Sequence, residues 1–301
     1  MTQQNARAGI WLAVVAMFVF AMQDGISRHL AEQYSVFMIV MIRYWFFLFF
    51  VMAVSKMRTG SVAATARTEQ PVLQFFRGVL LAAEILVTVV AFTMLGLIEA
   101  HAIFAIYPLI VAALSGPILG EAVGWRRWAA IGVGFVGMLI ILQPGFKVFS
   151  PHAFIAVGGA LLFALYNLLT RLAAAKDTAA TSFFWTGVGG FVIMTLIGPF
   201  FWEPMGGTDW YWMALLCVTG ATGHYLLIKA YEKAEASTVQ PFAYLQLVFA
   251  SMLGVTVFGE NLPITTVAGA GLIVIAGIFT LWREKRAKRG ASLGSGLGSN
   301  E

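Results

Sequence analysis

Ten apolar stretches, each close to the length of a membrane-crossing helix, dominate this sequence. A helix rises 1.5 Å per residue, so about 20 residues cross a hydrocarbon core of about 30 Å. Only 11% of the residues are charged, against roughly 25% in soluble domains. A soluble fold of this length cannot hide so much apolar surface. The sequence therefore predicts spans at 9–30, 36–55, 73–94, 98–117, 125–142, 151–171, 181–201, 209–229, 237–258 and 264–282.

The two ends of the chain are not expected to belong to the membrane core. Residues 9–22 continue into a full-length span and lack an A-x-A-like site, so they are not read as a cleaved signal peptide. Residues 283–301 form a tail whose end is rich in Gly and Ser, and we expect it to be cytoplasmic and either disordered or a remnant of recombinant sequence. The single cysteine, Cys217, excludes an internal disulfide.

The basic residues indicate how the spans are oriented. If the N-terminus is cytoplasmic and the spans alternate, the outer side receives only Arg28 and Lys147, while Arg43 lies within a span. This asymmetry follows the positive-inside rule and predicts an even number of spans with both termini inside. The predicted cytoplasmic set is Arg7, Lys56, Arg58, Arg67, Arg77, Arg126, Arg127, Arg171, Lys176, Lys229, Lys233, Arg283, Lys285, Arg286, Lys288 and Arg289.

The sequence also repeats itself. A shift of 139 residues places Gly120-Glu121 on Gly259-Glu260, and a shift of 143 places Ser27-Arg28 on Thr170-Arg171. The features fall in corresponding spans of two halves, 9–142 and 151–282. Because each half has five spans, the second enters from the opposite side, which predicts an inverted-topology repeat. The expected fold is an all-α membrane protein with ten transmembrane helices in two inverted five-helix repeats.

These features resemble a known family of transporters. Ten spans in two halves, LGE at 119–121, FGE at 258–260 and the Gly-rich stretches AAIGVGFVGMLIIL and AGAGLIVIAGIFTL resemble the EamA-type drug/metabolite transporter superfamily. Within it, the chain looks most like bacterial aromatic amino acid exporters. The resemblance implies export of a small metabolite by alternating access through a central cavity at the bacterial inner membrane. Where the family often has a proline in span nine, this chain has Gln246-Leu247, and Pro241 is expected to replace it.

The repeated Gly-Glu pair is expected to mark a helix end. Gly permits the end of a helix, and a carboxylate at the membrane surface can accept hydrogen bonds from backbone donors of the next segment. Glu121 and Glu260 are therefore interpreted as hinge or gating residues, with proton coupling as the alternative. Pro108 and Pro241 are interpreted as further hinges, since a proline removes one hydrogen bond and bends a helix.

Charges within spans are costly and mark candidate sites. Glu84, near mid-depth of span three, either lines a cavity and binds an ammonium group or is a protonated acid bonded to another helix. Asp24 and Arg28 are four residues apart and are expected to pair. Arg43 either pairs with Asp24 or meets a substrate carboxylate. Gln23, in the same part of span one, is a further candidate for substrate binding.

Other polar and aromatic residues complete the expected cavity. His101 either contacts a ligand or is a satisfied core residue. The deeper tyrosines can stack on flat side chains of a substrate. We expect a cavity between spans one, three, four, six, eight and nine, and its substrate-binding candidates are Glu84, His101, Tyr107, Tyr166, Asn167, His224, Tyr244, Gln246, Gln23 and Arg43.

The expected function is secondary transport of small metabolites, most plausibly amino acids including aromatic ones. Other metabolites, such as purines, drugs or nucleotide-like compounds, are the alternative, whereas nucleotide sugars would demand more deep Lys and Arg. An intramembrane enzyme is disfavoured, since the sequence lacks H-E-x-x-H and a convincing catalytic pair. Without a Walker motif, ATP-driven pumping is not expected. No cofactor, metal or nucleic acid is expected. The expected partners are the substrate and membrane lipid. The sequence leaves open the oligomeric state, the coupling to protons and the direction of transport.

Overall fold

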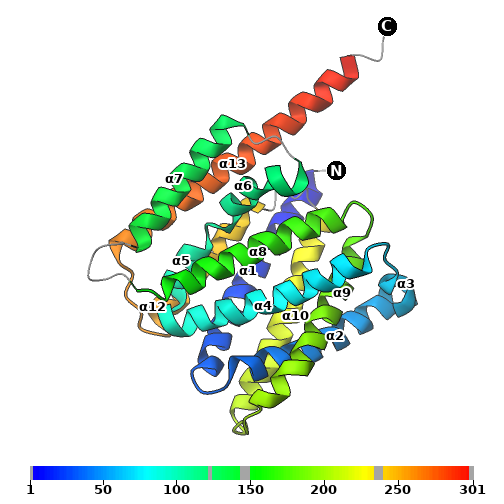
Figure 1. Cartoon of the computed structure of the whole chain (residues 1–301), viewed down its shortest axis with the longest axis vertical. Coiled ribbons are helices and arrows are strands. Elements are labelled where there is room, and N and C mark those ends of the chain that lie inside the picture. The colour runs from blue at the N-terminus through cyan, green and yellow to red at the C-terminus, as the bar shows by residue number, and fades with distance from the viewer. Residues whose placement is uncertain (1–2, 121–123, 143–149, 234–239, 298–301) are drawn as a thin grey trace.

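The computed structural model describes residues 3–120, 124–142, 150–233 and 240–297, and within these ranges it contains helices and no strand. Figure 1 shows a bundle of long helices, with α13 projecting beyond its neighbours. The first part of the chain forms α1 (Gln3–Ala31), α2 (Val36–Thr59), α3 (Val62–Ala66), α4 (Pro71–Leu95), α5 (Leu97–Phe104), α6 (Tyr107–Leu119) and α7 (Trp125–Leu142). The second part forms α8 (Ala153–Ala173), α9 (Ala179–Ile197), η1 (Gly198–Phe201), α10 (Asp209–Lys233), η2 (Gln240–Tyr244), α12 (Leu245–Thr256) and α13 (Ile264–Leu297).

Six helical stretches are long and apolar enough to cross a membrane, judged by length and composition. They are Arg7–Ala31, Val36–Arg58, Pro71–Leu95, Leu97–Leu119, Ala153–Ala173 and Ala179–Phe201. Three shorter apolar helices are Trp128–Leu142, Phe242–Thr256 and Ile264–Thr280. The predicted eighth span, helix α10, falls outside both groups. The prediction of an all-helical membrane protein therefore agrees with the structure, while ten complete crossings remain a prediction.

Two predicted spans are not continuous α-helices. Span four is divided into α5 and α6 by a turn at residues 105–106, and Pro108 lies in the first turn of α6. Proline fits the first turn of a helix because its missing N–H has no partner there. In span nine, the 3-10 helix η2, which contains Pro241, precedes α12. Thus each half has one span whose helix is interrupted or changes type.

The ends of the structure differ from the predicted limits. Helix α13 continues as regular helix to Leu297, well past the predicted end of the last span at residue 282. Residues 298–301 lie outside the described part. The predicted hydrophilic loop at 56–72 contains the short helix α3, whose N-cap Ser61 accepts a hydrogen bond from the Ala64 N–H at 3.3 Å.

The two halves of the chain are packed against each other rather than side by side as separate units. Helix α1 packs mainly on α10 and α12, α4 packs on α8 and α9, α2 packs on α9, and α7 packs on α13. The α7–α13 pair is visible on one side of the bundle in Figure 1. Gly137 and Gly269 allow this pair to approach closely, since a Cβ on either would lie against the other's carbonyl oxygen.

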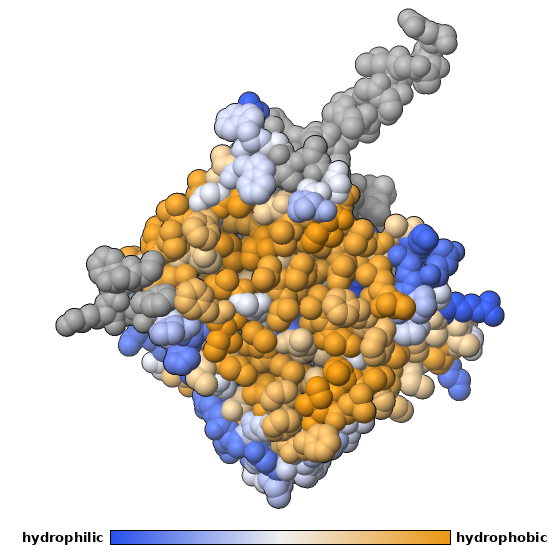
Figure 2. Space-filling view, in the orientation of Figure 1, coloured by the Kyte–Doolittle hydropathy of each residue, from blue (hydrophilic) through white to orange (hydrophobic). Residues whose placement is uncertain are grey.

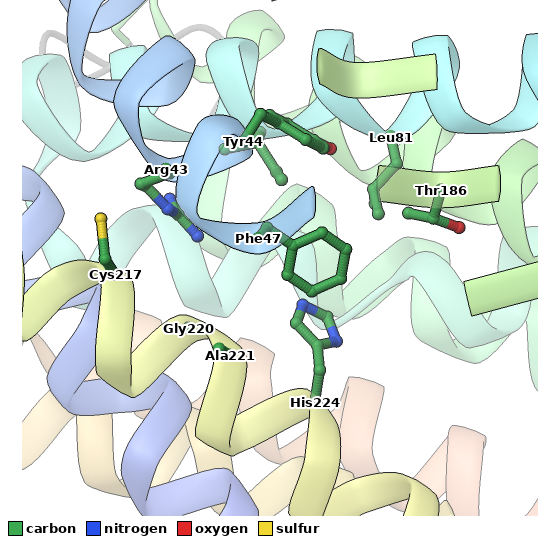
Figure 3. A pocket seen from close by; sticks show the side chains of 10 residues that line it. Arg43, Tyr44, Phe47, Leu81, Thr186, Cys217, Gly220, Ala221 and His224 are labelled. Carbon is green, nitrogen blue, oxygen red and sulfur yellow. The ribbon is translucent and has the colours of Figure 1, made fainter. Parts of the chain in front are cut away.

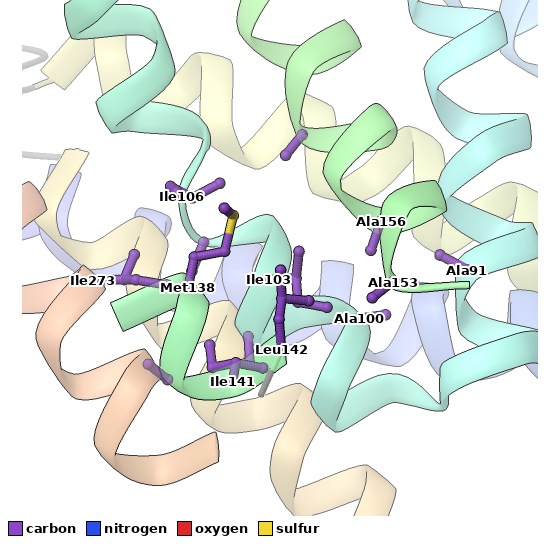
Figure 4. Packing of buried hydrophobic residues seen from close by; sticks show 14 of the residues in the cluster. Ala91, Ala100, Ile103, Ile106, Met138, Ile141, Leu142, Ala153, Ala156 and Ile273 are labelled. Atoms are coloured by element: carbon purple, nitrogen blue, oxygen red, sulfur yellow. The ribbon is translucent and has the colours of Figure 1, made fainter. Parts of the chain in front are cut away.

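The largest apolar core surrounds the break between α5 and α6. Ile103 is fully buried, and the cluster draws side chains from α4, α7, α8 and α13 as well (Figure 4). Small residues such as Ala100, Ala153 and Ala156 let these helices come close (Figure 4). Packing on several sides therefore holds α5 and α6 in place. This packing positions the polar residue His101, which lies in α5.

The surface carries much more apolar area than a soluble protein does. Figure 2 shows a broad hydrophobic field across the visible face, with hydrophilic residues gathered at its margins. Apolar side chains within helices, such as Phe49 and Ile275, are 72% and 65% exposed. Exposed apolar patches far above a few hundred Å² mark surfaces that contact lipid or another apolar partner.

Candidate functional site

A buried carboxylate in the last third of α1 forms the centre of the candidate site. Asp24 Oδ2 accepts a hydrogen bond from Gln246 Nε2 at 2.8 Å, and Asp24 Oδ1 accepts one from Gln23 Nε2 at 3.4 Å. His101 Nε2 lies 3.3 Å from Asp24 Oδ2, within ion-pair distance, but its geometry is not that of a hydrogen bond. We call Gln23, Asp24, His101 and Gln246 the Asp24 cluster.

The broken helices bring the cluster together. His101 belongs to α5, the first part of broken span four, and Gln246 lies in the first turn of α12, directly after η2. Asp24 and Gln23 come from α1, so residues from both parts of the chain meet at one carboxylate. A carboxylate buried away from water is retained when it is hydrogen-bonded or paired, because its desolvation is otherwise costly.

A basic side chain from α2 lies beside this cluster. Arg43 Nη1 donates a hydrogen bond to Ser27 Oγ at 3.5 Å, and Ser27 lies one helical turn from Gln23 and Asp24 on α1. Gln23 Oε1 is buried and has no hydrogen-bond partner among the described residues. A Cβ built on Gly220 of α10 would lie 2.9 Å from Gln23 Oε1 and 3.7 Å from Arg43 Nη2. The acceptor Gln23 Oε1 and the cationic Arg43 side chain therefore both lie next to Gly220 of α10.

A cavity opens next to these groups, between α2, α4, α9 and α10. Its empty space, counted together with open surroundings, is about 400 Å³, and the centre of a water-sized sphere can occupy about 30 Å³ of it. Figure 3 shows Arg43 on the Cys217 side of this space and Phe47 beside His224. We call it the α2–α10 cavity, and its lining is Arg43, Tyr44, Phe47, Leu81, Ile85, Thr186, Cys217, Gly220, Ala221 and His224.

Aromatic rings form one wall of the α2–α10 cavity. The His224 ring meets Phe20 edge-on with centroids 5.0 Å apart, and it meets Phe47 edge-on at 5.8 Å. Phe47 also contacts Phe183 at 4.9 Å. Such edge-to-face contacts are the favoured geometry for aromatic pairs. The wall can therefore receive another flat ring, while Arg43 supplies a positive charge at the side.

Three predicted site residues lie together in another place. The Phe163 ring of α8 is 4.8 Å from Tyr107 and 6.0 Å from Tyr166, and Asn167 Nδ2 donates a hydrogen bond to the Phe163 carbonyl oxygen at 2.7 Å. Asn167 thus bonds to its own helix. An aromatic group is formed by Tyr107, Phe163 and Tyr166, with Asn167 beside it. None of these residues lines the α2–α10 cavity.

Arg77 of α4 connects that group to one end of the bundle. Its side chain is 1% exposed, whereas the sequence places it near a cytoplasmic helix end. It donates hydrogen bonds to neutral acceptors on three helices: Gln74 Oε1, Tyr166 OH at 3.0 Å, Thr170 Oγ1 at 3.1 Å and the Ser182 carbonyl oxygen. Arg77 therefore joins α4, α8 and α9, and a purely topological role does not account for its burial.

Asp177, in the loop between α8 and α9, extends this network. Its carboxylate accepts hydrogen bonds from Thr68 Oγ1 at 2.6 Å, Gln74 Nε2 at 2.9 Å and the Glu69 N–H at 3.4 Å. Partial burial raises the pKa of Asp177, but these bonds and the nearby Arg77 charge outweigh it and hold the pKa below its usual value. The loop is thereby tied to the segment that precedes α4.

Glu84 is buried on α4, as the sequence suggested for a mid-span charge. Its side chain is 5% exposed, and Thr88 Oγ1 donates a hydrogen bond to Glu84 Oε1 at 2.7 Å. That partner is on the same helix, one turn away, and not on a neighbouring helix. Glu84 lies within electrostatic range of Asp24 and Arg43, so it belongs to the surroundings of the Asp24 cluster.

The expected pair between Asp24 and Arg28 is wrong. Arg28 instead forms an ion pair with Glu260 and a second one with Glu32 at 3.2 Å. The Glu260 carboxylate also accepts the Leu97 N–H at 2.8 Å. Asp24 has Gln246 and Gln23 as its hydrogen-bond partners, and Arg28 has Glu260 and Glu32 as its acidic partners.

Glu260 accepts backbone hydrogen bonds, as the Gly-Glu interpretation expects, but the donors come from the other half of the chain. The Ile98 N–H donates at 2.9 Å, next to the Leu97 N–H. The approach requires Gly96, whose φ is +83° and whose Cβ would overlap the Glu260 carboxylate. Its partner by repeat, Glu121, lies outside the described residues. The hinge roles of Glu260, Pro108 and Pro241 remain predictions.

Other predicted residues lie apart from the cavity lining. Tyr244, in η2, has a buried hydroxyl with no partner among the described residues and faces Gly277 of α13. Of the predicted substrate-binding residues, Arg43 and His224 line the cavity, while Gln23, His101 and Gln246 surround Asp24.

Sequence reasoning missed four residues at this site. Asp24 was expected in an ion pair with Arg28, and Tyr44, Phe47 and Thr186 were not singled out at all. Spans two and seven were left out of the expected cavity, yet α2 and α9 line it. The one available signal was Arg43, since the residue four positions after a buried cation, here Phe47, lies on the same face of the helix.

Comparisons with known proteins agree with this architecture. The model of the EamA-like transporter family matches residues 7–143 and 151–282. The chain is 25% identical to an S-adenosylmethionine uptake transporter of Rickettsia prowazekii over 282 residues, covering 93% of this chain and 94% of that protein. It is 33% identical to a riboflavin transporter of Vibrio cholerae over 191 residues, covering 60% and 62%.

Two further matches extend over most of the chain. A pseudopaline exporter of Pseudomonas aeruginosa is 25% identical over 272 residues, covering 90% of this chain and 94% of that protein. A solved crystal structure covers 95% of this chain and 99% of its own chain with a TM-score of 0.63 at 15% identity, which shows a shared fold. With the apolar helices and the two family matches, the chain is an integral, multi-pass membrane protein that belongs to the EamA-like transporter family.

Proposed function

We propose that this protein transports small metabolites that carry an amino acid end group and a flat ring, with S-adenosylmethionine and aromatic amino acids as the first compounds to test. The observation that carries the proposal is a cation that lines the α2–α10 cavity, Arg43, with the acidic Asp24 cluster close beside it. Asp24 and Gln23 offer acceptors for an ammonium group, and Arg43 offers a guanidinium for a carboxylate. Guanidinium groups bind carboxylates through paired donors.

The aromatic wall supports the second part of the substrate. Phe47 and His224 lie on the cavity in edge-to-face contact, and a ring of the substrate would extend this arrangement. The relatives named above transport S-adenosylmethionine, riboflavin or pseudopaline. S-adenosylmethionine has an amino acid end and a flat base, as the site requires, whereas riboflavin has a flat ring without an amino acid end.

The proposed mechanism is alternating access between two inverted five-helix repeats, 9–142 and 151–282, with 283–301 as a cytoplasmic tail. The helix contacts support a two-fold relation. In the repeat, α1 corresponds to α8, α2 to α9, α4 to α10 and α7 to α13. If corresponding helices are exchanged, the α1–α10 contact becomes the α8–α4 contact, and the α4–α9 contact becomes the α10–α2 contact. All four of these contacts are present. The α2–α9 and α7–α13 pairs convert into themselves. A central site between such repeats suits alternating access.

The remaining details of transport belong to the same proposal. We place the protein in the bacterial inner membrane with both termini cytoplasmic, following the distribution of Lys and Arg. Net export is the proposed direction, and the test below measures exchange so that it does not depend on direction.

The test is counterflow in proteoliposomes. Vesicles loaded with unlabelled S-adenosylmethionine should accumulate the labelled compound in a saturable way, and aromatic amino acids should compete. The methyl esters of the same amino acids should compete about tenfold less well, because they lack the carboxylate that Arg43 would bind. Counterflow of riboflavin without any counterflow of S-adenosylmethionine or amino acids, or equal competition by acids and esters, would contradict the proposed substrate class.

A further inference from the structure

The hydroxyl of Tyr44 is a buried polar group without a partner. Tyr44 is 4% exposed, and its OH forms no hydrogen bond within the described part of the chain. Buried hydroxyl groups are nearly always bonded, and an unbonded one carries a desolvation cost. An exception of this kind calls for a reason, and a ligand that supplies the missing partner is one.

Tyr44 is part of the α2–α10 cavity. It follows Arg43 on α2 and lines the cavity together with Leu81, Ile85 and Thr186. In Figure 3 its oxygen points toward the Leu81 and Thr186 side, whereas Arg43 lies toward Cys217. The basic end and the hydroxyl end of the cavity are therefore separate, and the Phe47 ring lies below Tyr44, beside His224, in this view (Figure 3).

The surroundings hold the Tyr44 ring but leave its hydroxyl without a bond. A Cβ on Gly190 of α9 would overlap the Tyr44 ring, so the ring lies directly on the α9 backbone. Leu81 and Ile85 of α4 have no polar side-chain atoms. Thr186 uses its own proton in a bond to the Ser182 carbonyl oxygen at 2.9 Å. Because the ring is fixed by packing, the direction of the hydroxyl is fixed as well.

We propose that Tyr44 is a specificity-determining residue that donates a hydrogen bond to an acceptor atom on the ring of the substrate. This inference rests on the proposed function, since it assumes that the amino acid end binds at Arg43 and Gln23. A flat ring that extends from there along Phe47 presents its far edge to the Tyr44 hydroxyl. The protein then prefers heteroaromatic rings with a nitrogen or carbonyl at that edge over plain hydrocarbon rings.

The test uses two competitors that differ at one ring atom. Phenylalanine and 3-(4-pyridyl)alanine have the same shape, but the pyridine nitrogen is an acceptor that the benzene ring lacks. Competition against S-adenosylmethionine counterflow at pH 7.5 should favour pyridylalanine by about fivefold to tenfold in the unaltered protein, the range of one neutral hydrogen bond. In the Tyr44→Phe variant, pyridylalanine should compete no better than phenylalanine.

The variant is chosen so that folding does not decide the outcome. Tyr44→Phe keeps the packed ring and removes a hydroxyl that has no partner, so the melting temperature in detergent should not fall. Tyr211→Phe is the matched control, because Tyr211 is 79% exposed and lies outside the cavity lining. It should keep the full preference for pyridylalanine.

Each alternative result has a distinct meaning. Equal competition by the two compounds in the unaltered protein, or an unchanged preference in Tyr44→Phe, overturns the role of Tyr44 and leaves the proposed function intact. Failure of both compounds to compete in the unaltered protein overturns the proposed substrate class, and the role of Tyr44 falls with it.

Discussion

Asp24 shows how one side chain can depend on both halves of the molecule. Its carboxylate is bound by Gln23 of its own helix and by Gln246 of α12, and it lies beside His101 of α5. Removing one partner of a buried, hydrogen-bonded charge costs several kcal/mol, because the remaining group stays buried without compensation. We therefore expect Asp24 to couple substrate binding to the relative position of the two halves.

The Asp24→Asn variant tests this coupling. It removes the charge while keeping the size of the side chain, and counterflow should fall at least about tenfold at equal protein abundance. Asp209→Asn is the control, since Asp209 accepts a hydrogen bond from Tyr34 OH at 2.6 Å near the start of α10, away from the cavity. Transport by Asp24→Asn that equals the control would remove Asp24 from the site.

Asp177 gives a prediction for pH. Its folded pKa lies below the usual value, so its bonds stabilise the fold above the unfolded pKa of about 4 and are lost as pH falls through the lower, folded pKa. At pH 6 the Asp177→Asn variant should melt about 1–3 °C below the unaltered protein. This difference should shrink below pH 4, and a difference that is independent of pH would contradict the assignment.

The sequence predicted the individual candidates better than their arrangement. Arg43, Glu84 and His101 stand out because polar groups are rare within apolar stretches. Their partners could not be deduced, since spacing along one helix suggests only local pairs. Arg28 shows the limit, because Asp24 and Glu32 both lie four residues from it, and it pairs with Glu32 and with Glu260 of the other half.

At the scale of elements, α7 and α13 approach each other closely through two glycines. A Cβ on Gly137 would lie 2.7 Å from the Gly269 carbonyl oxygen, and a Cβ on Gly269 would lie 2.5 Å from that of Gly137. These distances are too short for any other residue without movement of a backbone. Small residues of this kind allow close packing of helices within a membrane.

The Gly137→Val variant should separate the two helices. Overpacking of this type costs about 1–3 kcal/mol, so the melting temperature in detergent should fall by several degrees. Gly132→Ala on the same helix is the matched control, because no atom lies within 4 Å of a Cβ there. Equal melting temperatures for the two variants would show that the α7–α13 contact does not limit stability.

The positions of the helices were predicted well, but not all of their ends. Helical stretches occur at each of the ten predicted positions, since long apolar runs leave few alternatives in a membrane. The bend at Pro108 was predicted, because proline restricts its own helix. The continuation of α13 to Leu297 was not, since residues 283–297 lack an apolar pattern and helical periodicity gives no signal there.

For the whole molecule, the central claim is that the two repeats cross the membrane in opposite directions. The exchange of helix pairs supports a two-fold relation but does not by itself say which surface each half faces. That information comes from the odd number of spans in each half and from the basic residues. A measurement of sidedness in the membrane decides between opposite and equal orientation.

The most direct measurement uses single cysteines at equivalent positions of the two repeats. Gln33 follows α1 and Lys176 follows α8, they differ by the repeat shift of 143, and both side chains are exposed. In a Cys217→Ser background, Gln33→Cys should react with an impermeant maleimide added to intact cells, and Lys176→Cys should react only after the membrane is opened. Labelling of both positions from the same side would contradict the inverted repeat and the alternating access that depends on it.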